Sequence, residues 1–164
     1  MGSFAESPFA ALTVVVAPAI LTNASSVLSL GTSNRIARVV DRTRVLAAGL
    51  ATLDPASARA AAYREHIDRL RLRGQLLLSA LRWFYTSIGA FAAAALISVV
   101  GSVAASSAAD PVFQALVALG LLAGTTGVAG LVIGGVVMAR ETQLAVQFLD
   151  REVEFIQARE YTSP

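Results

Sequence analysis

The residues of this chain that could carry chemistry begin with polar side chains inside an apolar stretch near the amino terminus. Six of them recur at helical spacing and form one broad stripe: Thr22, Asn23, Ser25, Ser26, Ser29 and Ser33. Polar groups within a membrane are costly unless they meet partners or line water, so the stripe predicts a protein interior or the wall of a pore. The alternative is that the hydroxyls bond to carbonyl groups of their own helix.

A second cluster follows directly and is charged. It consists of Asn34, Arg35, Arg38, Asp41, Arg42 and Arg44. Three of its arginines share one face of a helix. In a monomer they would form a solvated basic collar attracted to anionic lipid headgroups. In a symmetric oligomer with this helix at the centre they would instead form rings that favour anions or pair with an acidic tail.

The residues that most enzymes need are missing from the sequence. There is no cysteine, and the single histidine, His66, is expected on the surface of a helix. No glycine-rich phosphate loop, nucleophile elbow, metal-ligand spacing or pair of intramembrane carboxylates occurs. We therefore expect no enzyme activity, no catalytic residue, no metal site and no cofactor.

The elements that hold these clusters are predicted to lie in a membrane. The 164 residues are 55% hydrophobic and 15% charged, whereas soluble domains are roughly a quarter charged. Three windows without a charged residue are long enough to cross a bilayer: residues 8–31, 83–105 and 112–139. A cleaved signal peptide is the alternative for the first window, but Glu6 precedes it and no arginine or lysine does.

Charge predicts the orientation of the spans. All thirteen cationic residues are arginines, and ten of them lie in residues 34–82 against four acidic residues, a net charge of +6. Cytoplasmic flanks carry the excess of arginine, so this segment is expected inside. The amino terminus and the loop 106–111 are then outside, and the tail 140–164, with a net charge of −2, is inside.

Apolar spacing predicts that the cytoplasmic segment is a packed hairpin. Two seams alternate in steps of three and four residues: Ile36, Val39, Thr43, Leu46, Leu50 and Leu53, then Tyr63, Ile67, Leu70, Gly74, Leu77 and Leu81. Three dipeptides pair an N-cap acceptor with a proline and predict helix starts: Ser7-Pro8, Asp54-Pro55 and Asp110-Pro111. The tail repeats an apolar face with Leu144, Phe148 and Phe155.

The fold class that follows is an all-α membrane protein with a single membrane domain over residues 1–164. Its first two transmembrane helices extend into a cytoplasmic antiparallel helical hairpin, and its third extends into a cytoplasmic amphipathic tail helix. Small residues of the third span are expected to pack helices, within the chain or between subunits. They are Gly120, Gly124, Gly127, Gly130 and Gly134.

Two sets of ion pairs are expected in the cytoplasmic part. Glu65 and Arg69 are four residues apart and should form a local helix pair. Glu152 and Glu154 of the tail could pair with arginines of the hairpin, where their role would be orientation because exposed pairs contribute little. The arginines concerned are Arg64, Arg69, Arg71 and Arg73.

Three segments resemble a known family. The long run from Thr32 to Leu46, the arginine-rich run from Leu70 to Arg82 and the run from Arg140 to Ala145 resemble the hallmarks of a bacterial family named domain of unknown function 2721. The resemblance spans about residues 18–155 and implies a bacterial inner membrane. Gly74 departs from the pattern, where a larger residue is expected, and this bears on how tightly the hairpin packs. The family name assigns no activity, so no catalytic residue is implied.

Two functions fit these observations. The first is a homo-oligomeric inner-membrane protein whose polar first helix lines a pore for ions or small solutes. The second is a non-conducting structural or accessory subunit of a larger membrane complex, or a scaffold that organises anionic lipid. The expected partners are the lipid bilayer, anionic headgroups and further copies of the chain. Nucleic acid is not expected, because the arginines lie next to the membrane and interleave with a packing seam.

Overall fold

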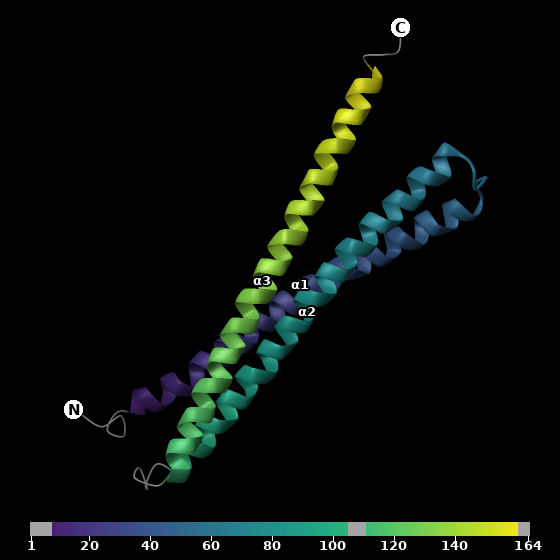
Figure 1. The fold of residues 1–164 in the computed structure, drawn as a ribbon. Helices are drawn as coiled ribbons and strands as arrows, with labels where there is room; N and C mark the ends of the chain where they lie inside the picture. Colours follow the sequence, from purple (N-terminus) through teal and green to yellow (C-terminus); the bar gives the residue numbers. More distant parts are fainter. Residues whose placement is uncertain (1–7, 105–110, 161–164) are drawn as a thin grey trace. The chain divides into compact units, whose positions relative to one another are not determined.

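Three long helices make up the described part of the chain. The computed structural model describes residues 8–104 and 111–160, with side-chain environments for residues 16–102 and 111–146. α1 spans Pro8–Ala51, α2 spans Ala58–Ala104 and α3 spans Pro111–Glu160 (Figure 1). No strand occurs among these residues, so the predicted all-helical fold is confirmed.

The helices are much longer than a membrane is thick. They contain 44, 47 and 50 residues, which corresponds to roughly 66 to 75 Å at 1.5 Å per residue, against about 30 Å for a bilayer core. α2 and α3 each contain a stretch long and apolar enough to cross a membrane. The span expected on α1 stays a prediction. Each helix runs unbroken from its uncharged window into its charged arm, as the sequence predicted.

Two of the three predicted helix starts are confirmed, and the start of α2 is corrected. α1 begins at Pro8 and α3 at Pro111, whereas α2 begins at Ala58 instead of Pro55. The Asp54 carboxylate accepts a hydrogen bond from the backbone N–H of Ala56 (3.0 Å), so it closes a turn. Ser57 then caps the helix, with its hydroxyl accepting a bond from the N–H of Ala60 (3.2 Å).

The three helices contribute to two compact units. The first contains Met1–Gly31 and Leu81–Gly134, and the second contains Thr32–Ala80 and Gly135–Pro164. Each helix therefore supplies most of its uncharged part to the first unit and, apart from Arg82, its charged residues to the second. The two units have different interiors, which are described separately below.

The first unit packs α2 against α3 by fitting large side chains onto glycines. Phe84, Ser87 and Phe91 are buried on one face of α2. A methyl group added at Gly127 would lie 2.6 Å from Phe91 Cε1, and one added at Gly134 would lie 2.6 Å from Phe84 Cε1. Separations this short leave no room for a side chain. The glycines therefore permit the close approach of the two helices.

A third glycine contact involves the backbone itself. A methyl group at Gly130 would lie 2.6 Å from Ser87 Oγ and 3.2 Å from the carbonyl oxygen of Trp83. The other two predicted packing glycines have more room. A methyl group added at Gly120 would lie 3.4 Å from Ile97 Cγ2, and one added at Gly124 would have nothing within 4 Å. Three of the five glycines thus serve packing within the chain.

The second unit contains the predicted hairpin of α1 and α2. All twelve seam positions are buried or half-buried, which agrees with the expected antiparallel packing (Figure 1). A methyl group at Gly49 would lie 2.8 Å from Tyr63 Cε1 near the turn, and one at Gly74 would lie 3.7 Å from Val39. The second distance is ordinary van der Waals contact. The hairpin is therefore closely packed at Gly74 even though the residue there is small.

Candidate functional site

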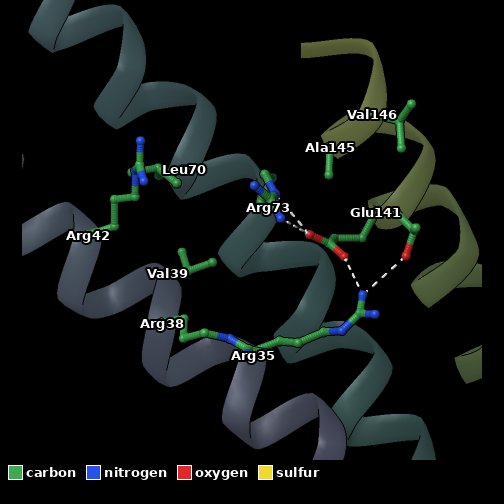
Figure 2. A pocket seen from close by; sticks show the side chains of 10 residues that line it. Arg35, Arg38, Val39, Arg42, Leu70, Arg73, Glu141, Ala145 and Val146 are labelled. Atoms are coloured by element: carbon green, nitrogen blue, oxygen red, sulfur yellow. Dashed lines mark hydrogen bonds and ion pairs between the residues drawn. The ribbon is translucent and has the colours of Figure 1, made fainter. Parts of the chain in front are cut away.

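The most unusual group in the second unit is a buried carboxylate. Glu141 lies on α3 with only 1% of its side chain exposed. Its Oε1 accepts a hydrogen bond from Nε of Arg73 on α2 at 2.8 Å, and Nη2 of the same guanidinium group lies within ion-pair distance of Oε1, also at 2.8 Å. Its Oε2 accepts one from Nη1 of Arg35 on α1 at 3.2 Å (Figure 2). One side chain of α3 thus holds both helices of the hairpin.

Thr142, which follows Glu141 on α3, is a second acceptor for Arg35. Nη1 of Arg35 also donates a hydrogen bond to the Thr142 hydroxyl at 3.1 Å. That hydroxyl in turn donates to the backbone carbonyl of Met138, one helical turn earlier, at 3.1 Å. Arg35 is therefore directed to its position by two acceptors on α3.

Burial makes this pairing energetically necessary. An ionised carboxylate that loses water without gaining a partner is strongly destabilising, and a pair is tolerated only when geometry and further hydrogen bonds compensate. Glu141 gains one charge-assisted hydrogen bond from each of two guanidinium groups, and a further ion-pair contact from Nη2 of Arg73. The arginines keep some contact with solvent, with 39% of Arg35 and 31% of Arg73 exposed. The group as a whole carries a net charge of +1.

A pocket opens beside this ion-pair group. Its volume is about 400 Å³, and ten residues line it: Arg35, Arg38, Val39, Arg42, Leu70, Arg73, Glu141, Thr142, Ala145 and Val146 (Figure 2). Four of them are arginines and one is acidic, so the lining has a net charge of +3. The remaining surface is mostly apolar. Such a lining suits an anion that also carries an apolar part.

Two of the pocket arginines have no acidic partner among the described residues. Arg38 and Arg42 lie four residues apart on α1 and are exposed. Other arginines of this unit are paired locally: Arg44 with Asp41 at 3.9 Å, Arg71 with Asp68 at 4.0 Å, and Arg69 with Glu65 as predicted. Arg59, Arg64 and Arg140 also lack an acidic partner among the described residues, but they do not line the pocket. Arg38 and Arg42 differ from them in lying beside two further arginines at the wall of one pocket.

The structure divides the predicted basic cluster into two groups. Arg35, Arg38 and Arg42 line the pocket together, which agrees with the shared helical face expected from their spacing. The other members, Asn34, Asp41 and Arg44, are exposed and do not line it. The shared face of Arg35, Arg38 and Arg42 is thus as expected from their spacing, whereas the role of the cluster as a basic collar stays a prediction.

The predicted polar stripe of α1 also divides. Ser25 and Ser29 are buried, Thr22 and Ser33 are half-buried, and Asn23 and Ser26 are exposed. Several hydroxyls bond to their own helix one turn back, with donor-acceptor distances of 2.8 to 2.9 Å; these are Thr22, Ser26 and Ser29. The alternative of local bonding therefore holds for these three side chains. The stripe does not form a single water-facing surface within one chain.

Ser25 and Asn23 differ from their neighbours. The Ser25 hydroxyl is fully buried and has no hydrogen-bond partner among the described residues. The Asn23 amide is exposed and forms no hydrogen bond to another described residue. These are the two groups of the stripe whose polar atoms still need a partner.

The sequence indicates Arg73 as a partner of the tail but does not single out Glu141. Arg73 is expected to pair with Glu152 or Glu154, and the structure pairs it with a different acidic residue of the tail, Glu141. The side chains of Glu152 and Glu154 lie outside the described residues. Glu141 follows Gly130, Gly134 and Met138 in steps of four, four and three residues, and this helical repetition marks it as part of the packing face of α3. That spacing was the available signal. No group of three potential metal ligands occurs among the described residues.

Comparison with known proteins agrees with the resemblance seen in the sequence. A family model described as "Protein of unknown function (DUF2721)" matches residues 15–151. The match includes the three residues of the ion-pair group and both unpaired arginines of the pocket. No curated protein and no solved structure matches the chain.

Proposed function

The chain belongs to the DUF2721 family of proteins of unknown function, and we propose that it is a homo-oligomeric protein of the bacterial inner membrane whose first helix lines a pore for ions or small solutes. In this proposal three spans cross the bilayer at residues 8–31, 83–105 and 112–139. The amino terminus is outside, and the hairpin 34–82 and the tail 140–164 are cytoplasmic. Charge distribution supports this arrangement, since ten of the thirteen arginines lie in the hairpin segment.

The single observation that carries the proposal is the exposed amide of Asn23. It lies near the middle of the uncharged window of α1, and no described residue satisfies it. Within hydrocarbon each unsatisfied polar group costs several kcal/mol, so it has to meet water or another polar group. Apolar residues surround it on the same helix, with Ile20, Val27 and Leu30 between 62% and 65% exposed. Lipid can cover these apolar side chains, so it is the amide of Asn23 that calls for water or for a polar group of another chain.

A second copy of the same chain suits this requirement. Around a symmetry axis near α1, each subunit would present the same asparagine to its neighbours. Side-chain amides contain both donors and acceptors, so they can bond to one another across helices or to water between them. Ser26 lies one turn further along the same face and is exposed as well. A narrow polar path along the axis follows from this arrangement.

Cysteine cross-linking tests the oligomer directly, because the natural chain contains no cysteine. Asn23→Cys should give a covalent homodimer on mild oxidation in native membranes. Leu96→Cys is the matched control, because Leu96 lies on α2 and is 66% exposed. This variant should form little covalent homodimer. Equal cross-linking at both positions, or none at Asn23→Cys, would contradict an oligomer built around α1.

Flux through liposomes tests conduction. Purified protein should pass ions or small solutes, and Asn23→Leu and Ser26→Leu should lower the flux several-fold by making the path apolar. Val27→Leu is the matched control, since Val27 is 63% exposed on the same helix and already apolar. Ser29 is unsuitable for this experiment because it is buried and a leucine there would disturb packing. Silence across many ions and solutes argues against a pore.

The alternative function is a non-conducting accessory subunit of a larger membrane complex. The local bonding of Thr22, Ser26 and Ser29 favours it, because these hydroxyls already donate their protons to the helix and can only accept hydrogen bonds from water. The helix of another protein would then cover Asn23. In that case Asn23→Cys should cross-link to one protein of different mass, in fixed stoichiometry, and the homodimer should be absent.

A further inference from the structure

The pocket beside Glu141 has more positive charge than the chain uses. Arg35 and Arg73 carry two positive charges, of which Glu141 neutralises one. Arg38 and Arg42 add two more positive charges to the lining of the pocket. Charges of one sign that line the same pocket repel one another, and this repulsion falls when an anion binds. The net charge of +3 fits a strongly anionic group.

The positive charges at the pocket all belong to arginine side chains, and this indicates which class of anion would bind there. A guanidinium group presents its N–H donors in a planar fork that matches the oxygens of a phosphate in pairs. Arg38 and Arg42 are four residues apart on α1, so their side chains start from neighbouring positions on one face. In Figure 2 the side chain of Arg42 extends toward Leu70, above the level of Arg38. Two forks on adjacent turns can bind different oxygens of one phosphate.

Glu141 prepares the site for such a ligand. It binds Arg73 through a hydrogen bond from Nε and an ion-pair contact with Nη2, both at 2.8 Å, and Arg35 through a hydrogen bond at 3.2 Å, so these guanidinium groups are already ordered at the wall of the pocket. Ordering the cations before the ligand arrives lowers the entropy cost of binding. The role of Glu141 is therefore positioning, while Arg38 and Arg42 are free to contact the ligand.

The apolar lining and the volume complete the description. Val39, Leu70, Ala145 and Val146 line the pocket together with the arginines. About 400 Å³ lies within the range of small-ligand sites, roughly 300 to 1,000 Å³, and exceeds the needs of a bare phosphate ion. The ligand therefore has room for an organic part attached to the phosphate.

We propose that this pocket is a binding site for a phosphate group, with Arg38 and Arg42 as its main ligands and with Arg35 and Arg73 held in place by Glu141. The phosphate could belong to the headgroup of an anionic lipid or to a soluble phosphate compound, because the chemistry of recognition is the same. This site lies within the second unit and does not depend on whether the chain conducts.

The experiment compares two sources and two charge-matched double variants of the full chain. Phosphatidylglycerol in phosphatidylcholine nanodiscs is the lipid probe, with retained lipid counted by native mass spectrometry. Inorganic phosphate is the soluble probe, with thermal stabilisation measured against chloride at equal ionic strength. Arg38→Gln/Arg42→Gln removes the proposed ligands. Arg44→Gln/Arg71→Gln removes the same charge from side chains 78% and 75% exposed outside the pocket.

We expect wild type and the control variant to retain phosphatidylglycerol preferentially, and the Arg38/Arg42 variant to bind it at least tenfold more weakly, since each charge-assisted hydrogen bond is worth about a factor of ten or more. Stabilisation by phosphate alone, lost in the same variant, supports the site and assigns it to a soluble compound. Equal losses in both double variants would overturn the proposal, because they would reveal only general attraction to surface charge. Absence of binding to both probes would overturn it as well.

Discussion

The two units of this chain use the same three helices but hold them together by opposite means. In the first unit α3 approaches α2 through glycines, and Phe84, Ser87 and Phe91 fill the space where side chains are missing. In the second unit α3 contacts the hairpin through Glu141, which reaches two arginines. A single helix thus changes from close packing to charge pairing along its length.

The difference follows from what each environment makes available. In the arrangement proposed above, the uncharged parts of the helices lie in lipid, where burial of apolar surface gives no preference for one neighbour over another, so a close fit decides the contact. Where water is present, long arginine side chains can keep their stems against the protein and their charged ends near solvent. In the second unit, charge pairing between Glu141 and the two arginines can fix the position of α3 against the hairpin. The small side chain of Ala145 nearby contributes little packing of its own. The four predictions below test this contrast.

The largest effect is expected from removing the cations around Glu141. Arg35→Gln together with Arg73→Gln leaves a buried carboxylate without a charged partner, and we expect the free energy of unfolding to fall by about 3 to 5 kcal/mol. Adding Glu141→Gln to this variant should restore most of the loss, because no buried charge then remains. Unfolding in mixed detergent micelles, followed by far-ultraviolet circular dichroism, measures both steps.

Replacing Glu141 alone sharpens this prediction, because losing the carboxylate and losing its two arginines should have unequal costs. Glu141→Gln alone should cost much less than the double arginine variant, because Arg35 and Arg73 are 39% and 31% exposed and can turn toward water. If removal of the carboxylate is as damaging as removal of both arginines, the ion-pair group stabilises the fold by shape and not by charge compensation.

The second effect concerns the glycine packing of the first unit. Gly130→Ala places a methyl group 2.6 Å from Ser87 Oγ and 3.2 Å from the backbone oxygen of Trp83, and the backbone cannot move aside as a flexible side chain could. We expect a loss of about 1 to 3 kcal/mol in the free energy of unfolding, as for an overpacked core. The same unfolding titration measures it.

Gly135→Ala is the matched control for this change. Its added methyl group meets nothing within 4 Å, and alanine favours a helix more than glycine does. Stability should therefore stay the same or rise slightly. A similar loss at both positions would mean that glycine matters for the flexibility of α3 and not for its approach to α2.

For the second unit, the sequence was enough to predict the helical hairpin but not the role of Glu141, the residue at the centre of the ion-pair group. Heptad-like spacing was enough for the hairpin, because burial of apolar seams depends on a period that can be counted. The shared face of Arg35, Arg38 and Arg42 followed from helical geometry alone. Glu141 was not recognised as a partner, because acidic residues near the inner end of a span are also common as solvated charges. Which arginine a carboxylate meets depends on how α3 is rotated, and the sequence does not specify that rotation.

Two features, one in the first unit and one at the turn, depend on more than periodicity. The spacing of the stripe places its residues along one side of α1, yet within the chain Ser25 and Ser29 are buried whereas Asn23 and Ser26 are exposed. Periodicity identifies a face without telling which neighbour covers each part of it. At the turn, Asp54-Pro55 and Ser57 offered two caps within four residues. The side-chain bond of Asp54 closes the turn, so Ser57 starts the helix.

The third prediction concerns a polar group that the first unit buries without a partner. The Ser25 hydroxyl is unsatisfied among the described residues, and such a group costs about 1 to 3 kcal/mol relative to a bonded one. Ser25→Ala should therefore leave stability unchanged or raise it by about 1 kcal/mol. Ser29→Ala is the control, because that hydroxyl bonds to the carbonyl of Ser25 at 2.9 Å and gains nothing from removal. Destabilisation by Ser25→Ala alone would indicate that Ser25 binds a group from outside the chain.

The smallest effect is expected for charges that the second unit leaves in water. Arg71 and Asp68 are 4.0 Å apart and 75% and 74% exposed, so solvent screens their attraction and side-chain entropy opposes it. Asp68→Asn should change the free energy of unfolding by less than about 0.5 kcal/mol. The small loss should shrink further as salt is added, whereas the buried pairs of Glu141 are screened much less. A cost near that of the Arg35/Arg73 variant would show that total charge balance in the hairpin, and not burial at Glu141, determines the stability of this unit.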